Sequence, residues 1–454
     1  MTSVTRDVRF LLSEPATDLA VATPATLAKA ISAEPRHLVV EGGGGARALR
    51  AAGYAVSRYV TLPDAADPAI VVPVGAAAPA RYALEEWLAP ASRLKRLRNR
   101  AAAELVARNV FLPGRGIALA TKKPGRPFLV AAAEQLGVPA TASWFLVPGA
   151  SDALSRGVFQ LFERGGREPA WALKFARVPG YEEPFARDEQ GLRLAAVAGN
   201  AARAHAPRLV GRFEAGGLPA SLETAAIGRR LIAYLASGSG RQEKLRTVQR
   251  VGEWTIAVGA ETAGPAERDI GERAELLERL SAEWRDRGTP VATADELQSV
   301  PAVLEHRDLG SWNVVVGRGT FTVLDWEDAT LAGFPLWDLW YLLAVVFAHL
   351  DGVGMDGPEQ ERYFVRLFRG ELPTSALLFS LTRRTVEALR LQEGDVSRLA
   401  TLAWLWHGIA HLARGETLQR HAPGATPART ASERRAELWL AEPGLGPGWT
   451  AWRG

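Results

Sequence analysis

Residues 305–328 read EHRDLGSWNVVVGRGTFTVLDWED. Three polar side chains that suit a buried site, Asp308, Asn313 and Asp325, fall within eighteen residues of otherwise largely apolar sequence. One interpretation is that they cap turns around a hairpin. The other is that they form a site for a metal ion and an attacking nucleophile, and the rest of the chain has to decide between the two.

The composition is typical of a folded protein with more than one domain. The 454 residues are 47% hydrophobic and 23% charged, and they exceed the size of one ordinary core, so two or three domains are expected. There is no cysteine, which excludes disulfides, thiolate chemistry and cysteine-bound zinc. The net charge of +4, from 54 basic and 50 acidic residues, gives no support for a nucleic-acid binder.

Two sequence features bear on location. The most apolar run, residues 336–350, is too short to span a bilayer and contains Asp338. The N-terminus lacks a basic segment followed by a long apolar core, so it does not resemble a signal peptide. We therefore expect a cytoplasmic protein with no membrane span.

The order of strand-like and helical segments predicts an α+β protein. Residues 37–60 predict a strand, a glycine turn, a short helix and a strand, and residues 82–109 predict a helix broken at Pro90. Three β-like runs between 143 and 178 predict an antiparallel meander, followed by a helix over 185–204. From 229 onward the pattern is mostly helical, interrupted by a strand-like pair.

Three other motifs have a functional and an ordinary interpretation, and the ordinary one is favoured for each. The tetraglycine Gly42–Gly45 suggests a dinucleotide-binding fold. That fold needs an acidic residue at the end of the next strand to bind a ribose, and the sequence has none there, so we expect an ordinary loop in which glycine permits an unusual backbone conformation. His407 and His411 have the i,i+4 spacing of a zinc protease but lack its glutamate, which predicts packing histidines. The basic run 93–100 spreads over more than one helix face and is expected to be solvated.

Phosphoryl transfer is the chemistry that would use the opening stretch. The reaction needs an aspartate to receive the proton of the attacking hydroxyl, and oxygen ligands to hold Mg²⁺ against the phosphates. Asp308 is expected in a loop, Asn313 follows five residues later, and the strand-like run FTVL ends at Asp325. A hairpin of this kind brings Asn313 and Asp325 together as a carboxylate and amide set suited to Mg²⁺.

The same reaction needs a lysine to orient the α and β phosphates, and Lys174 is the candidate. It lies in the apolar strand-like run AWALKFARV, where a lysine is costly to bury unless it is paired. Glu189, on the helix expected to follow, is its predicted partner. Asp188 or Glu183 would serve by a shift of register.

Together these residues resemble the protein-kinase-like fold, and within it the aminoglycoside phosphotransferase and choline kinase-like family of small-molecule kinases. The resemblance covers roughly residues 141–420 and leaves the N-terminal region outside. The motifs that carry it are His306–Asp308, Asn313, Asp325–Glu327 and Ala172–Lys174.

The resemblance implies further site residues. Segment 222–231, LETAAIGRRL, corresponds to the hinge whose backbone contacts adenine, which places Glu223 and Ala225 in the cofactor site. Asp338 corresponds to a buried aspartate that braces the catalytic loop through hydrogen bonds. The loop over the phosphates, PGASDALSRG, lacks the GxGxxG pattern, and its Ser151 and Ser155 would cap phosphates.

Two details separate the chain from protein kinases and from its nearer relatives. Arg307 replaces the glycine common in the small-molecule branch and completes the His-Arg-Asp of protein kinases. However, Asp338 lies only thirteen positions after Asp325, which is too short for a long activation segment, and no Ala-Pro-Glu motif closes it. A small-molecule acceptor is therefore expected.

The sequence thus predicts a bilobal kinase-like fold, with a small antiparallel-sheet lobe and a mostly helical lobe, preceded by a small α/β domain. The expected segments are a separable N-terminal α/β domain of unknown role at 1–140, a small lobe at 141–228, a helical lobe at 229–425 and a tail at 426–454. The predicted activity is transfer of the γ-phosphoryl group of ATP, with Mg²⁺, to a hydroxyl of a small molecule. The alternative is a catalytically inactive kinase-like module that binds a nucleotide or regulates a partner.

The sequence leaves the acceptor and the oligomeric state open. Four acids in the helical region would favour a cationic amine, as in an aminoglycoside or an amino alcohol, or would simply lie at an exposed helix start: Asp351, Asp356, Glu359 and Glu361. Fourteen tryptophans would equally suit stacking on a sugar ring.

Overall fold

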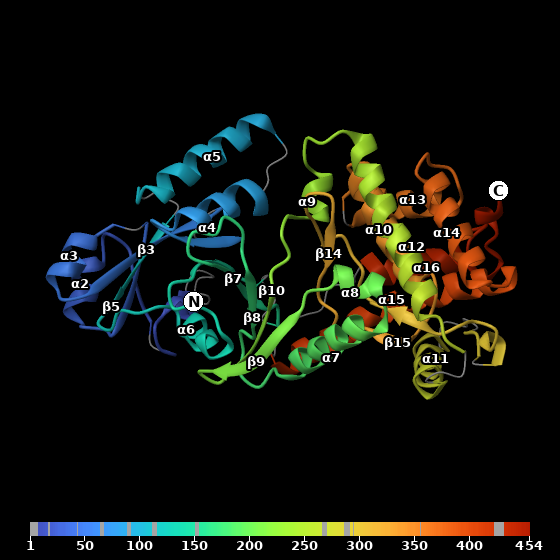
Figure 1. Ribbon diagram of the computed structural model, residues 1–454, viewed down its shortest axis with the longest axis horizontal. Coiled ribbons are helices and arrows are strands. Elements are labelled where there is room, and N and C mark those ends of the chain that lie inside the picture. The colour runs from blue at the N-terminus through green and yellow to red at the C-terminus, as the bar shows by residue number, and fades with distance from the viewer. Residues whose placement is uncertain are drawn as a thin grey trace. The chain divides into compact units, whose positions relative to one another are not determined.

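The structure, a computed structural model, describes most of the chain (Figure 1). The described residues are 8–16, 19–42, 44–63, 68–88, 92–110, 116–149, 154–265, 270–285, 291–293, 295–354, 356–421 and 431–454, without the side chains of Arg93 and of 410–421. Three residues of the sequence motifs, Gly43, Pro90 and Ser151, lie outside this description, as does the side chain of His411.

The chain divides into two compact units, each described here by itself. The first contains residues 1–185 and 208–229, and the second contains residues 186–207 and 230–454. Most strands belong to the first unit and most helices to the second, which confirms the α+β class predicted from the sequence.

A ten-stranded sheet forms the first unit, in the order β1-β2-β5-β3-β4-β6-β7-β8-β10-β9. Its strands are β1 (Ala20–Ala22), β2 (His37–Glu41), β3 (Ala55–Leu62), β4 (Ile70–Pro73), β5 (Gly116–Thr121), β6 (Ser143–Val147), β7 (Gly157–Phe162), β8 (Trp171–Phe175), β9 (Leu209–Ala215) and β10 (Leu218–Thr224). The neighbours β6, β7 and β8 pair antiparallel, which confirms the predicted meander.

Short helices accompany this sheet. They are η1 (Arg9–Leu11), α2 (Leu27–Ser32), α3 (Ala46–Ala51), α4 (Ala77–Tyr82), the π-helical turn η2 (Ala83–Trp87), α5 (Arg93–Ala107), α6 (Phe128–Ala132) and η3 (Ala133–Leu136). The predicted succession of β2, α3 and β3 is confirmed. Because α3 has only six residues and β2 pairs antiparallel with β5, the glycine loop does not belong to a dinucleotide-binding fold.

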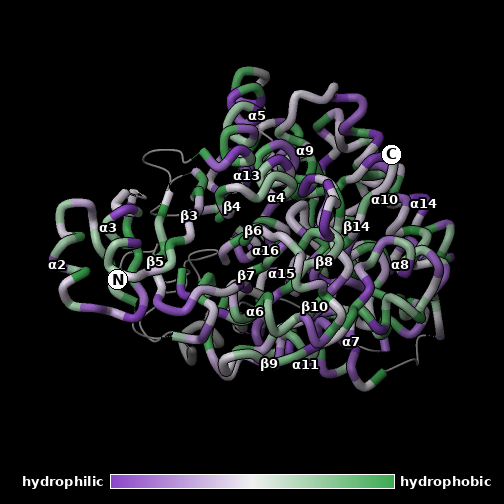
Figure 2. Tube along the Cα trace, turned by 60° about the vertical axis from the view of Figure 1, so that its left-hand side comes forward, coloured by the Kyte–Doolittle hydropathy of each residue, from purple (hydrophilic) through white to green (hydrophobic). Residues whose placement is uncertain are grey.

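The longest helix of the first unit, α5, carries the basic run noted in the sequence. Lys95, Arg98 and Arg100 are exposed, and the Ser92 side chain caps the helix by accepting the Lys95 N–H at 3.2 Å. Figure 2 shows hydrophilic and hydrophobic stretches alternating along α5. The interpretation of these three side chains as a solvated face is confirmed.

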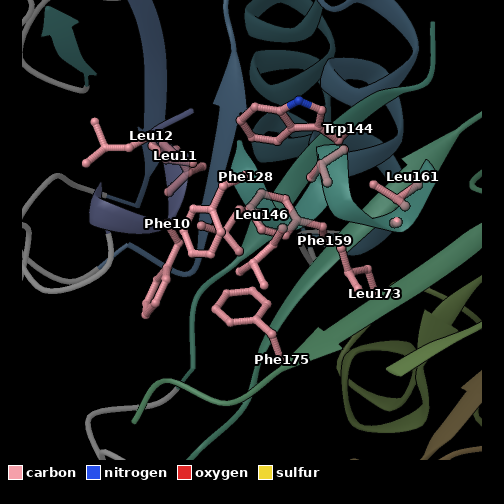
Figure 3. Close-up of a cluster of buried hydrophobic side chains, with 14 of the residues drawn as sticks. Phe10, Leu11, Leu12, Phe128, Trp144, Leu146, Phe159, Leu161, Leu173 and Phe175 are labelled. Carbon is pink, nitrogen blue, oxygen red and sulfur yellow. The ribbon is translucent and has the colours of Figure 1, made fainter. Parts of the chain in front are cut away.

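One apolar core joins the N-terminal segment to the strands of the meander. Phe10 packs edge-on against Phe175 at 4.8 Å between ring centroids, and Phe175 stacks on Phe159 at 5.4 Å. Figure 3 shows Phe10, Phe159 and Phe175 in this cluster beside Phe128 and Trp144. Sequence segments more than 160 residues apart therefore contribute to the same core.

A second apolar core in this unit also crosses the boundary predicted near residue 140. Tyr82 of α4 lies against Phe145 and Phe162, with ring centroids 6.3 and 5.8 Å away, and both phenylalanines are fully buried. Strand β4 pairs with β6 at Val71 and Leu146. The predicted boundaries at 140, 228 and 425 stay predictions, but strands on both sides of 140 share one sheet.

Helix α7 (Glu183–Ala198) begins at the end of the first unit and runs into the second, and α8 (Asn200–His205) follows after Gly199. The helix predicted over 185–204 is thus confirmed, with one break. The other helices of the second unit are α9 (Leu231–Leu235), α10 (Arg241–Thr262), α11 (Ile270–Arg285), η4 (Asp295–Leu297), α12 (Trp337–Leu350), α13 (Gly357–Phe368), α14 (Ser375–Leu389), α15 (Glu393–His421), α16 (Ala431–Ala441), η5 (Gly446–Gly448) and η6 (Ala451–Arg453).

Five short strands complete the fold: β11 (Arg229–Arg230), β12 (Val303–Glu305), β13 (Val314–Val316), β14 (Phe321–Val323) and β15 (Thr330–Gly333). The strands β13 and β14 form the predicted hairpin, with Val314 opposite Val323. The antiparallel pair of β12 and β15 was not predicted. These two pairs frame the loop that contains Asp308.

The apolar run 336–350 forms α12, which is buried along most of its length. His407 of α15 is 4% exposed and stacks on Tyr341 of α12 at 3.7 Å between ring centroids, so its predicted packing role is confirmed. Among the described residues, no helix is both long enough and apolar enough to cross a membrane.

The segment predicted as a tail, 426–454, contributes to the core of the second unit. Trp449 is fully buried, donates its indole N–H to the Phe368 carbonyl at 2.8 Å and packs against Trp439 at 5.4 Å. The indole thus both fills apolar space and satisfies a helix-end carbonyl.

We expect a fragment that begins at residue 141 to be much less stable than the full chain. Removing residues 1–140 exposes Phe145 and Phe162, and an aromatic side chain loses about 2 to 3 kcal/mol when it leaves a core. Thermal unfolding and binding of a hydrophobic dye measure the effect. If the fragment unfolds at the temperature of the full chain without binding the dye, residues 1–140 are a separable domain, as the sequence predicts.

Candidate active site

The loop between β12 and β13 is held by one buried carboxylate. Asp338, near the start of α12, accepts the backbone N–H of His306 at 2.6 Å and that of Arg307 at 2.9 Å, one on each oxygen. Arg307 has φ of 68°, a left-handed conformation that is rare for residues other than glycine. The predicted bracing contact of Asp338 is therefore present, and it holds a backbone turn that is otherwise unfavourable.

The adjoining His306 side chain ties the same loop to the neighbouring hairpin. Its Nε2 lies 2.8 Å from the Leu324 carbonyl oxygen, and the residue is 1% exposed. Because Leu324 follows β14 directly, this contact joins the loop that contains Asp308 to the segment that carries Asp325.

Asp308 and Asn313 lie together, as the sequence predicts. The Asn313 amide nitrogen lies 2.9 Å from both the backbone carbonyl and the Oδ2 atom of Asp308, and the Trp312 indole N–H is 3.4 Å from the same Oδ2. Since the Asn313 amide nitrogen is used in these contacts, its Oδ1 atom is the one available to a cation. One asparagine can therefore orient the carboxylate and ligate a metal.

The charge state of Asp308 depends on its burial. Burial raises the pKa of Asp308 to about 6, while His306 and the Trp312 hydrogen bond act in the opposite direction. The carboxylates of Asp325 and Asp328 raise the pKa of Asp308 a little further, so both lie within electrostatic range. A carboxylate with a raised pKa is a stronger proton acceptor once it is ionised.

Asp325 follows Leu324 with φ of 57°, the second left-handed residue of the site. Burial lowers the pKa of Arg230, and the charge of Asp325 acts in the opposite direction. The Arg230 guanidinium therefore lies within electrostatic range of Asp325. Together with Asn313, Asp325 supplies an amide and a carboxylate oxygen, the hard donors that Mg²⁺ prefers. The donor types therefore suit Mg²⁺, and the assignment of Asn313 and Asp325 as its ligands stays a prediction.

Helix α7 packs directly on this segment. Asp188, 1% exposed, accepts the Trp326 backbone N–H at 3.0 Å. A Cβ at Gly191 would lie 1.8 Å from the Trp326 carbonyl oxygen, so only glycine permits this approach. Glu189 instead pairs with Arg193 one turn along the helix, at 2.6 Å. The predicted pairing of Glu189 with Lys174 joins residues of the two units and stays a prediction.

In the first unit, Lys174 forms an ion pair that sequence reasoning missed. Its Nζ lies 2.9 Å from Oε1 of Glu223, and both side chains are nearly inaccessible to solvent. Glu223 of β10 lies opposite Ala172 of β8, which makes Lys174 its diagonal neighbour on the same face of the sheet. Glu223 was expected in the cofactor site as part of the hinge segment 222–231, but its pairing with Lys174 becomes visible only once β8 and β10 lie side by side.

The segment predicted to contact adenine is held from the N-terminal region. The Tyr82 hydroxyl accepts the Gly228 N–H at 2.9 Å and lies 3.3 Å from the Gly228 carbonyl oxygen. Arg229 pairs with Glu86 at 2.9 Å. The N–H of Ala225, a predicted cofactor contact, already donates to the Ala170 carbonyl at 3.0 Å. Only the carbonyl of Ala225 can therefore contact a ligand while this hydrogen bond is kept.

The loop predicted to cover the phosphates is only partly described. Ser151 lies outside the described residues, and Ser155 is partly exposed before β7. The phosphate-capping role of both serines stays a prediction.

Comparison with known proteins agrees with the resemblance drawn from the motifs. Residues 150–374 match the model of the phosphotransferase enzyme family. No curated protein matches the sequence. One similar solved structure is the crystal structure of aminoglycoside-3'-phosphotransferase of type VIII, with 19% identity, a TM-score of 0.33 and coverage of 57% of this chain and 99% of that one. Another is the co-crystal structure of WbdD and kinase inhibitor LY294002, with 12% identity, a TM-score of 0.28 and coverage of 88% and 74%.

Burial of Asp308 predicts a measurable effect of pH on stability. Its pKa in the folded state, about 6, lies above the ordinary value of 3.8, so this group lowers stability progressively as the pH rises from 3.8 to about 6, and the full loss is present above that pH. We expect Asp308→Asn to be more stable than the wild type at pH 7 to 8, by up to about 3 kcal/mol, with the difference shrinking toward pH 4. Denaturant unfolding with EDTA present measures this.

The exposed Asp328→Asn is the matched control, and a much smaller change is expected. An Asp308→Asn variant whose stability follows that of the wild type at every pH would show that the carboxylate is not buried in solution.

Proposed function

Because residues 150–374 match the model of the phosphotransferase enzyme family, we propose that this chain transfers the γ-phosphoryl group of ATP to a hydroxyl of a small molecule. The observation that supports it best is the arrangement of Asp308 and Asn313 on a loop held by Asp338. A purely structural turn does not require a buried carboxylate whose burial raises its pKa.

Asp308 receives the proton of the acceptor in this proposal. The acceptor oxygen forms a bond to the γ-phosphorus, the bond between that phosphorus and the bridging oxygen breaks, and ADP leaves with the electron pair. The hydroxyl proton passes to the Asp308 carboxylate, whose Oδ2 is oriented by Asn313 and Trp312. Positioning of this kind, with little covalent work by the protein, is how phosphoryl transfer is catalysed.

Asn313 and Asp325 would hold Mg²⁺, which supplies neutralisation of the phosphate charge when bound. The two residues flank the open end of one hairpin, Asn313 just before β13 and Asp325 just after β14, and Leu324 N–H donates to the Asn313 carbonyl at 2.7 Å. This bond keeps the two ends of the hairpin in register. The chain thus offers two oxygen ligands, and Mg²⁺ commonly completes its shell with waters and phosphate oxygens.

Lys174 is proposed to orient the α and β phosphates. Its ion pair with Glu223 keeps the ammonium charged in an otherwise apolar strand. Glu223 therefore acts in the cofactor site through Lys174. The carbonyl of Ala225 and the backbone up to Gly228 are proposed to face the adenine, while Glu189 stays a proposed partner of Lys174.

A small acceptor is favoured over a peptide by the short segment after Asp325. Strand β15 begins at Thr330 and α12 at Trp337, so most of the chain between Asp325 and Asp338 belongs to regular structure or to short turns. That leaves no long segment to form a peptide-docking platform.

The structure also favours an acceptor that stacks through a ring over an acceptor whose amine is bound by the four acids of the helical region. Asp351 pairs with Arg241 at 2.6 Å, and Glu361 pairs with Arg434 at 3.1 Å, so two of the acids are already neutralised. Trp312, partly exposed, lies beside the Asp308 carboxylate. Its indole offers an apolar face on which a sugar or amino sugar would stack.

The second candidate function is a kinase-like module that binds nucleotide without catalysis. It is less well supported, because the described residues include every predicted polar group of the reaction: Lys174, Asp308, Asn313 and Asp325. An inactive module has no need to keep all four.

We expect Asp308→Asn to lower kcat by about 10²- to 10⁴-fold and to leave ATP affinity nearly unchanged. The physical reason is that the carboxylate takes the acceptor proton and does not contact the phosphates. A coupled assay of ADP release, over a panel of sugars, amino sugars and amino alcohols, measures kcat. Lys174→Ala is the contrast, because it should weaken ATP binding and turnover together. Equal turnover by Asp308→Asn and the wild type would remove the catalytic assignment.

We also expect Asp325→Ala to lose metal-dependent nucleotide binding while remaining folded. ATP should raise the thermal unfolding temperature of the wild type more with Mg²⁺ than with EDTA, and this difference should vanish in the variant. The exposed Asp328→Ala, three residues further on, is the matched control and should keep it. If the difference survives in Asp325→Ala, the metal lies elsewhere.

A further inference from the structure

Helix α5 (Arg93–Ala107) of the first unit is anchored by one face. It packs against α4 and η2, where its residues Ala103 and Val106 are fully buried in an apolar core (Figure 1). Asn99 donates its amide N–H to the Leu84 carbonyl at 3.0 Å. The opposite face of the helix therefore faces away from the core of this unit.

That outward face carries leucines. Leu94, Leu97 and Leu105 are 79%, 64% and 43% exposed. Together with the exposed Ala101 they follow one another at spacings of three, four and four residues, which places them in one line along an α-helix. Eight large hydrophobic side chains of the described residues are strongly exposed, and half of them are these three leucines and the nearby Val110. Apolar exposure is thus concentrated here, whereas most surfaces show it singly.

The positive charge of the chain is concentrated in the same segment. Residues 77–110, which contain α4, η2 and α5, have seven basic and three acidic residues, a net charge of +4. The whole chain also has a net charge of +4, so the rest of the chain is neutral in total. The segment with the exposed leucines is therefore the cationic part of the molecule.

The cations beside the leucines are not neutralised. Lys95, Arg98 and Arg108 are exposed, and none of the three has an ion pair within the part of the chain that the structure describes. The acids of the segment, in contrast, are each paired with an arginine: Glu85 with Arg100 at 3.4 Å, Glu86 with Arg229 at 2.9 Å and Glu104 with Arg81 at 2.6 Å. An anionic surface that approaches the outward face meets free positive charges and apolar side chains together.

This combination fits the surface of an anionic membrane better than a protein partner. A helix that lies in the membrane interface inserts leucines among the acyl chains and places lysines and arginines against anionic headgroups. Arginines close to the apolar line can extend their charged ends to the headgroups while their stems stay among lipid. Protein interfaces depend mostly on buried tryptophan, tyrosine and arginine, with leucine under-represented, and α5 contains no aromatic residue.

We propose that α5 docks the protein on the surface of an anionic membrane, with the three leucines inserted and the three free cations against the lipid phosphates. The helix lies in the interface and does not cross it, because its 15 residues are too few to span the hydrocarbon layer. None of the residues assigned to phosphoryl transfer belongs to α5. Docking therefore sets where the protein acts and takes no part in the proposed reaction.

Flotation of the full chain with lipid vesicles tests the proposal. The wild type should bind vesicles of phosphatidylcholine mixed with phosphatidylglycerol but not vesicles of phosphatidylcholine alone, and binding should weaken as salt is added. The double change Leu94→Ser and Leu97→Ser should weaken binding about tenfold or more, because two apolar side chains no longer enter the lipid. The double change Lys95→Gln and Arg98→Gln should weaken it to a similar extent through lost charge.

Val197→Ser and Arg167→Gln are the matched controls. Val197 of α7 is 79% exposed, and Arg167 is an exposed arginine of the first unit. Both variants should bind the vesicles as the wild type does. All the variants should keep the unfolding temperature of the wild type and its stabilisation by Mg·ATP, since every changed side chain is exposed and distant in sequence from the proposed reaction. Failure of either proposal thus leaves the other standing.

The lack of cysteine in the chain allows one dye to report on contact with lipid. Leu97→Cys labelled with an environment-sensitive dye should brighten on vesicles that contain phosphatidylglycerol, and Val197→Cys with the same dye should not. An equal response at the two positions would overturn the proposal, as would a wild type that does not float with these vesicles. So would a wild type that leaves the vesicles unbound and self-associates in sedimentation velocity, if the leucine variant is monomeric.

Discussion

The candidate active site depends on the Asp338 carboxylate, which accepts two consecutive backbone N–H groups at 2.6 and 2.9 Å. Arg307 can keep its left-handed backbone because its own amide and that of His306 are both held in this way. The turn aims Asp308 toward Asn313 and places His306 against the Leu324 carbonyl. A single side chain at the start of α12 therefore sets the relative positions of the groups proposed for proton transfer and metal binding.

Two buried ionisable side chains behind this loop hold backbone groups. Burial raises the pKa of Glu305 to about 8, while Arg307 acts in the opposite direction, and the Glu305 Oε2 atom accepts the Phe334 N–H at 3.0 Å. Arg273 donates to the Val300 carbonyl at 2.9 Å and lies over the Phe334 ring. The backbone on both sides of the β12–β15 pair is thus held by hydrogen bonds from these side chains, which supports the loop that contains Asp308.

The N-terminal region is physically continuous with the strands that carry Lys174 and Glu223. It contributes strands to the same sheet as Lys174, shares two apolar cores with it, and holds Gly228 through the Tyr82 hydroxyl. The segment that ends at Gly228 is therefore fixed in part by residues of the N-terminal region.

Local pattern was sufficient to predict the α+β class, the meander, the β13–β14 hairpin and the grouping of Asp308 with Asn313, because each depends on residues close in sequence. The bracing role of Asp338 was available only through the family resemblance. Pairing of Lys174 with Glu223 was not predictable, since it requires β8 and β10 to be neighbours in register over nearly fifty intervening residues. The contact of Tyr82 with Gly228 likewise exists only once the strand order is set. Sequence patterns report which faces are apolar and which side chains carry chemistry, whereas long-range pairing of strands decides which of those side chains meet.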